Sequence, residues 1–232
     1  MNILCIDTCS ELGHIVLANG PSILAVSSLH SRDRQGESLM PRIDTLCREH
    51  AVKPSDLDMI GVCIGPGGFT SLRVGLSTAK GLAMANDALI VGALSLRVMA
   101  RSAGVSGIVV PVLNAYRGDV FAAAYNVHDA VLTELCAPSH GPVDVIEGSI
   151  SESLGDREFT LVGDAVRTHP AVFDSKNSLR HLSDVEQSTA EALHHEVWAE
   201  FERRGPDDLL SLQAEYLRPS DAKLPSTPQR PR

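Results

Sequence analysis

Hydrophobic residues come in runs with short polar breaks over the first thirty positions of the chain. The runs cover residues 2–7, 13–19 and 22–30, and the last two are rich in β-branched and small residues. Runs of this length, bounded by turn residues such as Asn19-Gly20-Pro21, are typical of strands. Because the connections are too short for a crossover, we predict three antiparallel strands.

After these runs, the hydrophobic residues take up the spacing of a helix. Residues 37–51 place Leu39, Ile43 and Leu46 on one face, which predicts an amphipathic helix, and residues 57–64 predict a buried strand. A second helix is predicted at 70–85. Beyond it we predict strands at 89–93, 108–113 and 159–163, a hairpin at 119–127 and 131–136, and helices at 95–103 and 186–203. Strands mixed with crossover helices indicate an α/β fold with mixed sheets.

The chain restarts the order of its own beginning after residues 100–110, where a strand and a hairpin follow one another again. We therefore expect two similar subdomains, 1–105 and 106–218. Residues 219–232 contain four prolines in 14 residues. We expect this tail to be disordered or extended.

Composition narrows the classes of function. The 232 residues include 20 Lys and Arg against 29 Asp and Glu, a net charge of −9, with 44% hydrophobic and 4% aromatic residues. An acidic chain without a basic cluster, and with few aromatic rings for base stacking, is poorly suited to bind nucleic acid tightly by itself. No apolar run is long enough to span a membrane, and no signal-peptide pattern opens the sequence, so we expect a cytoplasmic protein.

A glycine-rich segment is the first candidate for chemistry. Residues 65–75 read GPGGFTSLRVG between a predicted strand and a predicted helix, a spacing that matches neither the P-loop nor the dinucleotide fingerprint. Backbone N–H groups in such a turn can hold an anion, and Asp7 at the end of the first strand can hold a hydrated magnesium ion. The candidate anion or nucleotide loop comprises Asp7, Thr8, Gly65, Gly67, Gly68, Thr70 and Arg73. The alternative is structural: a tight turn with Thr70 or Ser71 as the N-cap of the helix, and Asp7 as a turn cap.

The predicted helix at 70–85 has little side-chain bulk. Its interior Gly75 and Gly81 each cost about 0.8–1 kcal/mol relative to alanine, so a close neighbour should offset them. We expect a partner protein to cover this helix and the helix at 37–51. The expected interface residues are Met40, Cys47, Leu72, Leu76, Ala79 and Ala83. The alternative is that the stripe packs against the chain's own sheet.

The sequence contains no motif for catalysis or for a metal. The nine histidines include no H-x-x-x-H pattern, and the five cysteines form no C-x-x-C pair. No serine or cysteine lies in a nucleophile motif. We therefore predict no catalytic residues and no metal site.

Four segments, taken in order, resemble the bacterial TsaB (YeaZ) family. They are residues 3–9, 65–75, 112–121 and 216–219. The family usually reads GPGSFTGLRxG in the second segment and DARRGEVY in the third. This chain departs from those patterns at Gly68, Ser71, Asn114, Tyr116 and Asp119. The resemblance implies an actin-like ATPase-type fold (ASKHA, RNase H-like) of two similar subdomains.

The resemblance also implies a function. The family acts in placing the threonylcarbamoyl group on the adenosine beside the anticodon of tRNAs that read codons beginning with A. It implies a non-catalytic scaffold that forms a heterodimer with the TsaD transferase through its first two helices, is joined by the TsaE ATPase, and meets tRNA only through the complex. No intrinsic cofactor is implied, although ATP or ADP with Mg can bind at the interface of the complex. Whether the chain forms a homodimer without its partner stays open.

Two alternatives come from other classes of protein. One is an ATP-binding phosphotransferase or ATPase of the actin-like superfamily, which would use Asp7 and the glycine-rich segment. The other is a protease, and for it the sequence offers no nucleophile–base arrangement.

Overall fold

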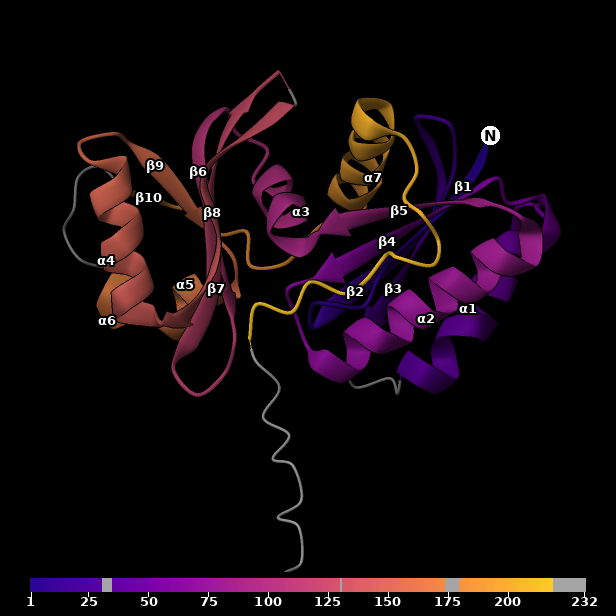
Figure 1. The fold of residues 1–232 in the computed structure, drawn as a ribbon, viewed down its shortest axis with the longest axis horizontal. Helices are drawn as coiled ribbons and strands as arrows, with labels where there is room; N and C mark the ends of the chain where they lie inside the picture. The colour runs from indigo at the N-terminus through magenta and orange to yellow at the C-terminus, as the bar shows by residue number, and fades with distance from the viewer. Residues whose placement is uncertain (31–34, 130, 174–179, 219–232) are drawn as a thin grey trace, which may run out of the picture.

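Two five-stranded sheets stand at opposite ends of the protein in the computed structural model, which describes residues 1–30, 35–129, 131–173 and 180–218 (Figure 1). The strands of the first sheet are β1 (Asn2–Asp7), β2 (Leu12–Asn19), β3 (Ser22–His30), β4 (Met59–Gly65) and β5 (Leu89–Leu94). Their order is β3-β2-β1-β4-β5. β1 to β3 pair antiparallel and β1, β4 and β5 pair parallel, so the three predicted antiparallel strands are confirmed.

The second sheet repeats this arrangement. Its strands are β6 (Gly107–Asn114), β7 (Asp119–His128), β8 (Val131–Pro142), β9 (Phe159–Val162) and β10 (Arg180–Leu182). Their order is β10-β9-β6-β7-β8, with β6 to β8 antiparallel and β6, β9 and β10 parallel. β6 therefore holds the place of β1, and the expectation of two similar units is confirmed.

Alternate residues of β1 face two different helical layers. Leu4 and Ile6 pack with α1 (Gln35–Glu49) and α2 (Phe69–Asn86). Ile3 and Cys5 pack with α7 (Ala190–Arg204) on the opposite face. This strict alternation follows from the two-residue repeat of a strand, and it buries every residue of β1 after Asn2. The short 3₁₀ turn η2 (Pro54–Asp56) leads into β4.

The second sheet is also covered on both faces. Val110 and Val112 pack with α4 (Val143–Leu154), α5 (Asp164–Thr168) and α6 (Pro170–Phe173), whereas Val109 packs with α3 (Ser95–Ser102). Figure 1 shows α3 and α7 next to each other between the two sheets.

These two inner helices each cover the sheet of the other half. α3 follows the first sheet in sequence but packs on the second, and α7 follows the second sheet but packs on the first. Beyond α7 the chain stays on the first half, where Glu215 N–H donates to the Ile64 carbonyl over 2.7 Å. The expected subdomain 106–218 is therefore wrong at its end, because residues 190–215 complete the first half.

Most other predicted elements are confirmed with shifted ends. The helix predicted at 186–203 begins at Ala190, because the Thr189 side chain caps it by accepting from the Ala192 N–H over 3.1 Å. The suggested N-cap of α2 is wrong: the cap position is Gly68, which offers no side chain, instead of Thr70 or Ser71.

Four elements of the second half were not predicted from the sequence, namely α4, α5, α6 and β10. α4 had a usable signal, since Ile146, Ile150 and Leu154 recur at helical spacing and are buried. The predicted tail 219–232 lies outside the described residues. None of the helices in the described ranges is long and apolar enough to cross a membrane.

Candidate functional site

A cleft of about 350 Å³ opens between the two halves, at the ends of β1 and β6. Its walls come from the glycine-rich loop before α2, the turns after β1 and β6, the first residues of α3, helix α5 and the loop before α7. Asp7 reaches the cleft from the end of β1, and Asn114 reaches it from the corresponding end of β6. A concave site at the junction of two structural units is the usual place for a ligand.

Asp7 lies at the floor of the cleft with 1% of its surface exposed. Its Oδ1 accepts from the Cys9 N–H over 2.7 Å, which closes the turn after β1. Its Oδ2 accepts from the Ser188 hydroxyl over 3.0 Å and from the Ser10 hydroxyl over 3.3 Å. The carboxylate therefore serves as the turn cap considered from the sequence, and it also ties the β1 turn to the loop before α7.

The glycine-rich loop packs directly on the β1 turn. A Cβ on Gly67 would lie 2.7 Å from the Cys9 carbonyl oxygen, so only glycine allows this approach. Gly68 N–H donates to the same carbonyl over 3.5 Å, and the Thr8 hydroxyl donates to the Ser71 carbonyl over 2.7 Å. The two predicted parts of the anion site are thus brought together, but several of their polar groups bond to each other.

Four residues assigned to the anion loop, namely Thr8, Gly65, Thr70 and Arg73, are not among the described residues that line the cleft. Gly65 is buried, and a Cβ on this residue would lie 3.0 Å from the Glu215 carbonyl oxygen. Thr70 is exposed on α2. The Arg73 guanidinium lies 3.8 Å from the centre of the Phe69 ring, and its Nε donates to the Tyr216 hydroxyl over 3.0 Å. Sequence spacing could not reveal these local partners.

The cleft is acidic. Asp7, Glu11, Asp164 and Glu186 line it, and the single arginine among its described lining residues, Arg167, forms an ion pair with Glu186 at 2.8 Å. Burial raises the pKa of Asp164 above its ordinary value, even though its Oδ1 accepts from the Asn114 N–H over 2.9 Å. A phosphate group would meet net repulsion here unless a cation accompanied it.

Two sulfur atoms lie beside Asp7. One ligand-type atom from each of Asp7, Cys9 and Cys63 falls within 4.8 Å of the others. The Cys9 thiol donates to the Cys63 carbonyl over 3.4 Å. Sequence reasoning missed this group because Cys9 and Cys63 are 54 positions apart; the parallel pairing of β1 with β4 brings them together.

The predicted partner interface needs a correction. Four of its residues have at most 1% of their surface exposed and belong to the core of the first half: Cys47, Leu72, Ala79 and Ala83. Met40 is 48% exposed and Leu76 is half-buried. The small-residue stripe of α2 therefore packs against the chain's own sheet, which was the alternative considered from the sequence.

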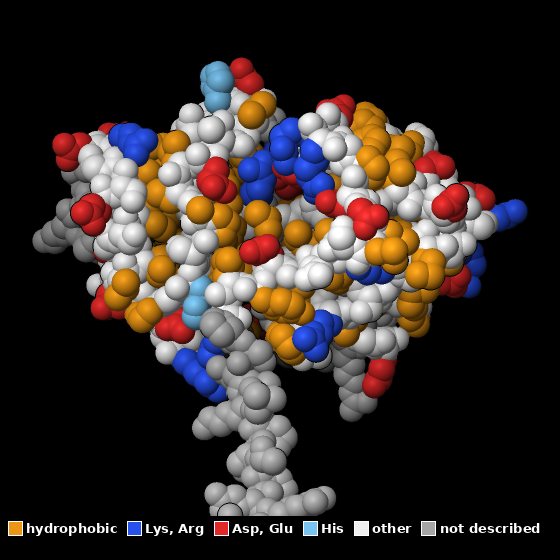
Figure 2. Space-filling model, in the orientation of Figure 1, with side chains coloured by type: hydrophobic (Ala, Val, Ile, Leu, Met, Phe, Trp, Pro, Cys, Tyr) orange, Lys and Arg blue, Asp and Glu red, His pale blue; other side chains and the backbone are white. Residues whose placement is uncertain are grey.

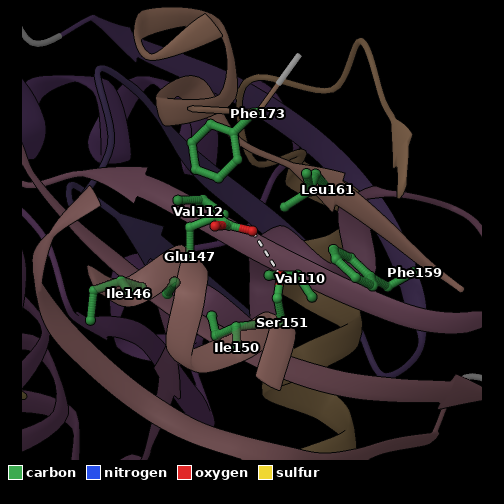
Figure 3. A pocket seen from close by; sticks show the side chains of 10 residues that line it. Val110, Val112, Ile146, Glu147, Ile150, Ser151, Phe159, Leu161 and Phe173 are labelled. Atoms are coloured by element: carbon green, nitrogen blue, oxygen red, sulfur yellow. Dashed lines mark hydrogen bonds between the residues drawn. The ribbon is translucent and has the colours of Figure 1, made fainter. Parts of the chain in front are cut away.

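A second hollow lies in the other half, between α4 and the second sheet (Figure 3). It is lined almost wholly by hydrocarbon, and at its side the Ser151 hydroxyl donates to Glu147 over 2.7 Å. Its internal space of about 10 Å³ is at most that of one water molecule. This hollow is a packing gap, and the cleft between the halves is the candidate site.

Fold and cleft together define a class of protein. Two copies of one α/β unit that face each other across a polar cleft form the actin-like ATPase-type (ASKHA) fold. A solved Pseudomonas aeruginosa protein, described as similar to peptidase YeaZ, superposes with a TM-score of 0.81 at 19% identity and covers 94% of this chain and 99% of its own. The expected fold class is thereby confirmed.

The sequence model of the family TsaD, tRNA N6-adenosine threonylcarbamoyltransferase, matches residues 29–217. The chain belongs to this family.

Within the family the chain is similar to TsaB proteins, and the resemblance drawn from the sequence is confirmed. The tRNA threonylcarbamoyladenosine biosynthesis protein TsaB of Bacillus subtilis (strain 168) is 29% identical over 136 residues, which are 58% of this chain and 59% of that protein. TsaB of Escherichia coli (strain K12) is 29% identical over 129 residues, 54% of this chain and 55% of that protein. The chain thus spans between half and two thirds of the length of these curated relatives.

Proposed function

We propose that the chain is a non-catalytic scaffold in the threonylcarbamoylation of the adenosine next to the anticodon. In this role it forms a heterodimer with a TsaD-like catalytic subunit, is joined by a TsaE-like ATPase, and meets tRNA only through the complex. Because its partners act on tRNA, we place it in the cytoplasm. The TsaB relatives, named for threonylcarbamoyladenosine biosynthesis, support the pathway.

The proposal of a scaffold role rests on the hydrogen bonds and the charges in the cleft. In a phosphotransferase the glycine-loop amides must be free to bind a phosphate. Here the Gly68 N–H donates to the Cys9 carbonyl over 3.5 Å. The acidic lining adds repulsion toward phosphate. These features favour a structural role for the cleft.

Reconstitution tests the proposal. tRNA threonylcarbamoylation is measured with TsaD-like and TsaE-like partners of the same organism, with and without this chain. We expect modification only when the chain is present. Full activity without it would refute the scaffold role, and activity of the chain without the TsaD-like subunit would refute its non-catalytic nature.

Exposed apolar residues on α1 and α2 replace the buried ones as the proposed contacts of the catalytic subunit. Met40 on α1 is 48% exposed and Met84 on α2 is 66% exposed. The double variant Met40→Asp, Met84→Asp should lose co-purification with the TsaD-like subunit and keep the melting temperature of the isolated chain. Val145→Asp is the matched control, because Val145 is 59% exposed on α4 in the other half. Retained co-purification of the double variant would contradict this interface.

A nucleotide-binding role is the second candidate, favoured by the volume of the cleft and by its position between the two repeats. ATP or ADP with Mg would then bind in the cleft alone or at the interface of the complex. Binding would raise the melting temperature, and above the Kd the rise would grow with the logarithm of the ligand concentration. A melting temperature unchanged by millimolar ATP–Mg, for the isolated chain and for the complex, would exclude this role.

A further inference from the structure

The floor of the cleft holds a buried negative charge without a positive neighbour. Asp7 is 1% exposed, and in the described ranges no Lys, Arg or His forms an ion pair with its carboxylate. Its neighbours are two serine hydroxyls and one backbone N–H. A buried carboxylate in proteins is normally paired with a cationic side chain or bound to a metal ion. The missing positive charge is the first sign of a cation site.

The sulfur atoms of Cys9 and Cys63 complete a donor set around the same point. One ligand atom from each of the three residues lies within 4.8 Å of the other two. Ligands of one tetrahedral zinc ion lie about 2.0–2.3 Å from the metal, so binding would draw these three side chains closer together. Cys63 is fully buried, whereas Cys9 is half-buried and lines the cleft. Asp7 and Cys9 both line the cleft, so the cleft gives access to the site.

The chemistry of the donors selects the metal. Two thiolates and one carboxylate suit a borderline-soft ion such as Zn²⁺, whereas Mg²⁺ and Ca²⁺ prefer oxygen ligands alone. Three protein ligands and a side open to the cleft match the pattern of tetrahedral sites that keep a water molecule as fourth ligand. If Asp7 were the only ligand, its oxygen atoms would favour a hydrated magnesium ion. The two cysteine sulfur atoms beside it favour zinc instead.

Charge balance is also favourable. Without metal, the carboxylate carries −1. Binding of a divalent ion releases the two thiol protons to solvent, and two thiolates with the carboxylate and the ion again sum to −1.

We propose that Asp7, Cys9 and Cys63 form a binding site for one zinc-like divalent cation at the floor of the cleft. The site needs no partner protein, so it is independent of the scaffold role. Its two sulfur ligands come from the β1 turn and from β4. A bound ion would therefore fasten the turn that carries the cleft wall to the central strands of the first sheet.

Cobalt(II) is the probe, because thiolate-to-cobalt charge transfer and the intensity of the d–d bands report sulfur ligation and tetrahedral geometry. The full chain is reduced, stripped with a chelator and titrated with Co²⁺. We expect one ion per chain with a thiolate charge-transfer band, displaced by Zn²⁺ and unaffected by excess Mg²⁺. Absence of the charge-transfer band, or displacement by Mg²⁺, would overturn the proposal.

Single variants then locate the ligands. Cys9→Ser and Cys63→Ser should each weaken Co²⁺ binding by at least about tenfold and reduce the charge-transfer band. Loss of a residue that only hydrogen-bonds to a ligand already lowers metal affinity by about tenfold or more, and loss of a ligand itself should lower it at least as much. Asp7→Asn should weaken binding and keep the band. Cys136→Ser is the matched control, because Cys136 lies on β8 in the other half. Undiminished Co²⁺ binding in both serine variants would overturn the site. If Cys63→Ser fails to fold, the result for Cys9→Ser, at the half-buried position, decides whether the site exists.

Discussion

At the scale of single residues, the two glycines inside α2 have different causes. A Cβ on Gly75 would lie 2.3 Å from the Thr8 hydroxyl oxygen, whereas nothing lies within 4 Å of a Cβ on Gly81. The Thr8 side chain cannot easily move, because it is fully buried and its hydroxyl is bound to the Ser71 carbonyl. The close neighbour expected from the sequence is therefore the chain's own β1 turn, and it explains Gly75 only.

We expect opposite effects of alanine at these two positions. Gly75→Ala should lower the free energy of unfolding by about 1–3 kcal/mol, since the added methyl overpacks the contact with Thr8. Gly81→Ala should raise it by roughly 0.5–1 kcal/mol, the gain in helix propensity at an unhindered site. Urea unfolding of both variants measures the difference. Equal effects would show that the approach of α2 to Thr8 does not restrict this position.

At the scale of the element, the position of a small residue on α2 decides what a large substitution does. Ala79 is fully buried in the core of the first half, and Ala85 is exposed on the same helix. Ala79→Trp should destabilise the isolated chain by about 1–3 kcal/mol or more, because the indole has no space beside the sheet. Ala85→Trp is the control and should leave the melting temperature nearly unchanged. A normal melting temperature for Ala79→Trp would restore the original view that this stripe faces a partner.

The same elements show what a sequence pattern can predict. Periodicity identified β1 to β3, α1 and α2 because their buried residues recur at fixed spacing. It could not predict that α7 covers the first sheet, because an apolar face does not specify which sheet it meets. At the site, Asp7 and Gly67 were found from turn chemistry. Cys63 was not, since its role depends on strand pairing between distant segments.

At the scale of the whole molecule, a buried ionic cluster joins the helices between the two sheets. Glu196 of α7 is fully buried and pairs with Arg97 of α3, and it also accepts from Arg101 of α3 over 2.7 Å. Figure 2 shows basic side chains gathered where α3 and α7 meet. Because α3 packs on the second sheet and α7 on the first, this cluster fixes the two halves relative to each other.

Removing the central charge of the cluster should be costly. Glu196→Gln removes the buried carboxylate that Arg97 and Arg101 share, while Arg97 keeps its ion pair with Glu200 at 3.4 Å. We expect a loss of up to about 3–5 kcal/mol in the free energy of unfolding. Glu202→Gln, an exposed position on the same helix, should change it by less than about 0.5 kcal/mol. Denaturant unfolding compares the two variants. A loss as small as that of the control would mean that the cluster does not hold the halves together.

A neighbouring group of ion pairs, in which Arg204 pairs with Glu200 and Asp207, makes the stability of the fold depend on pH. Burial tends to raise the pKa values of Glu200 and Asp207, but hydrogen bonds from arginines outweigh it, so both lie below their ordinary values of 4.5 and 3.8. A carboxyl with a lower pKa in the folded than in the unfolded state stabilises the fold above its unfolded pKa. That contribution disappears as pH falls through the folded pKa. Arg204 is the shared partner, since it pairs with both carboxylates.

We therefore expect the protein to lose stability as the pH drops below 4.5. Asp207→Asn should reduce stability at neutral pH and make the remaining stability less sensitive to acid, because one of the two carboxyls no longer takes up a proton. The free energy of unfolding of both proteins, measured from about pH 7 to about pH 3, tests this. Parallel pH profiles for wild type and variant would contradict it, because the Asp207–Arg204 pair would then contribute equally at every pH.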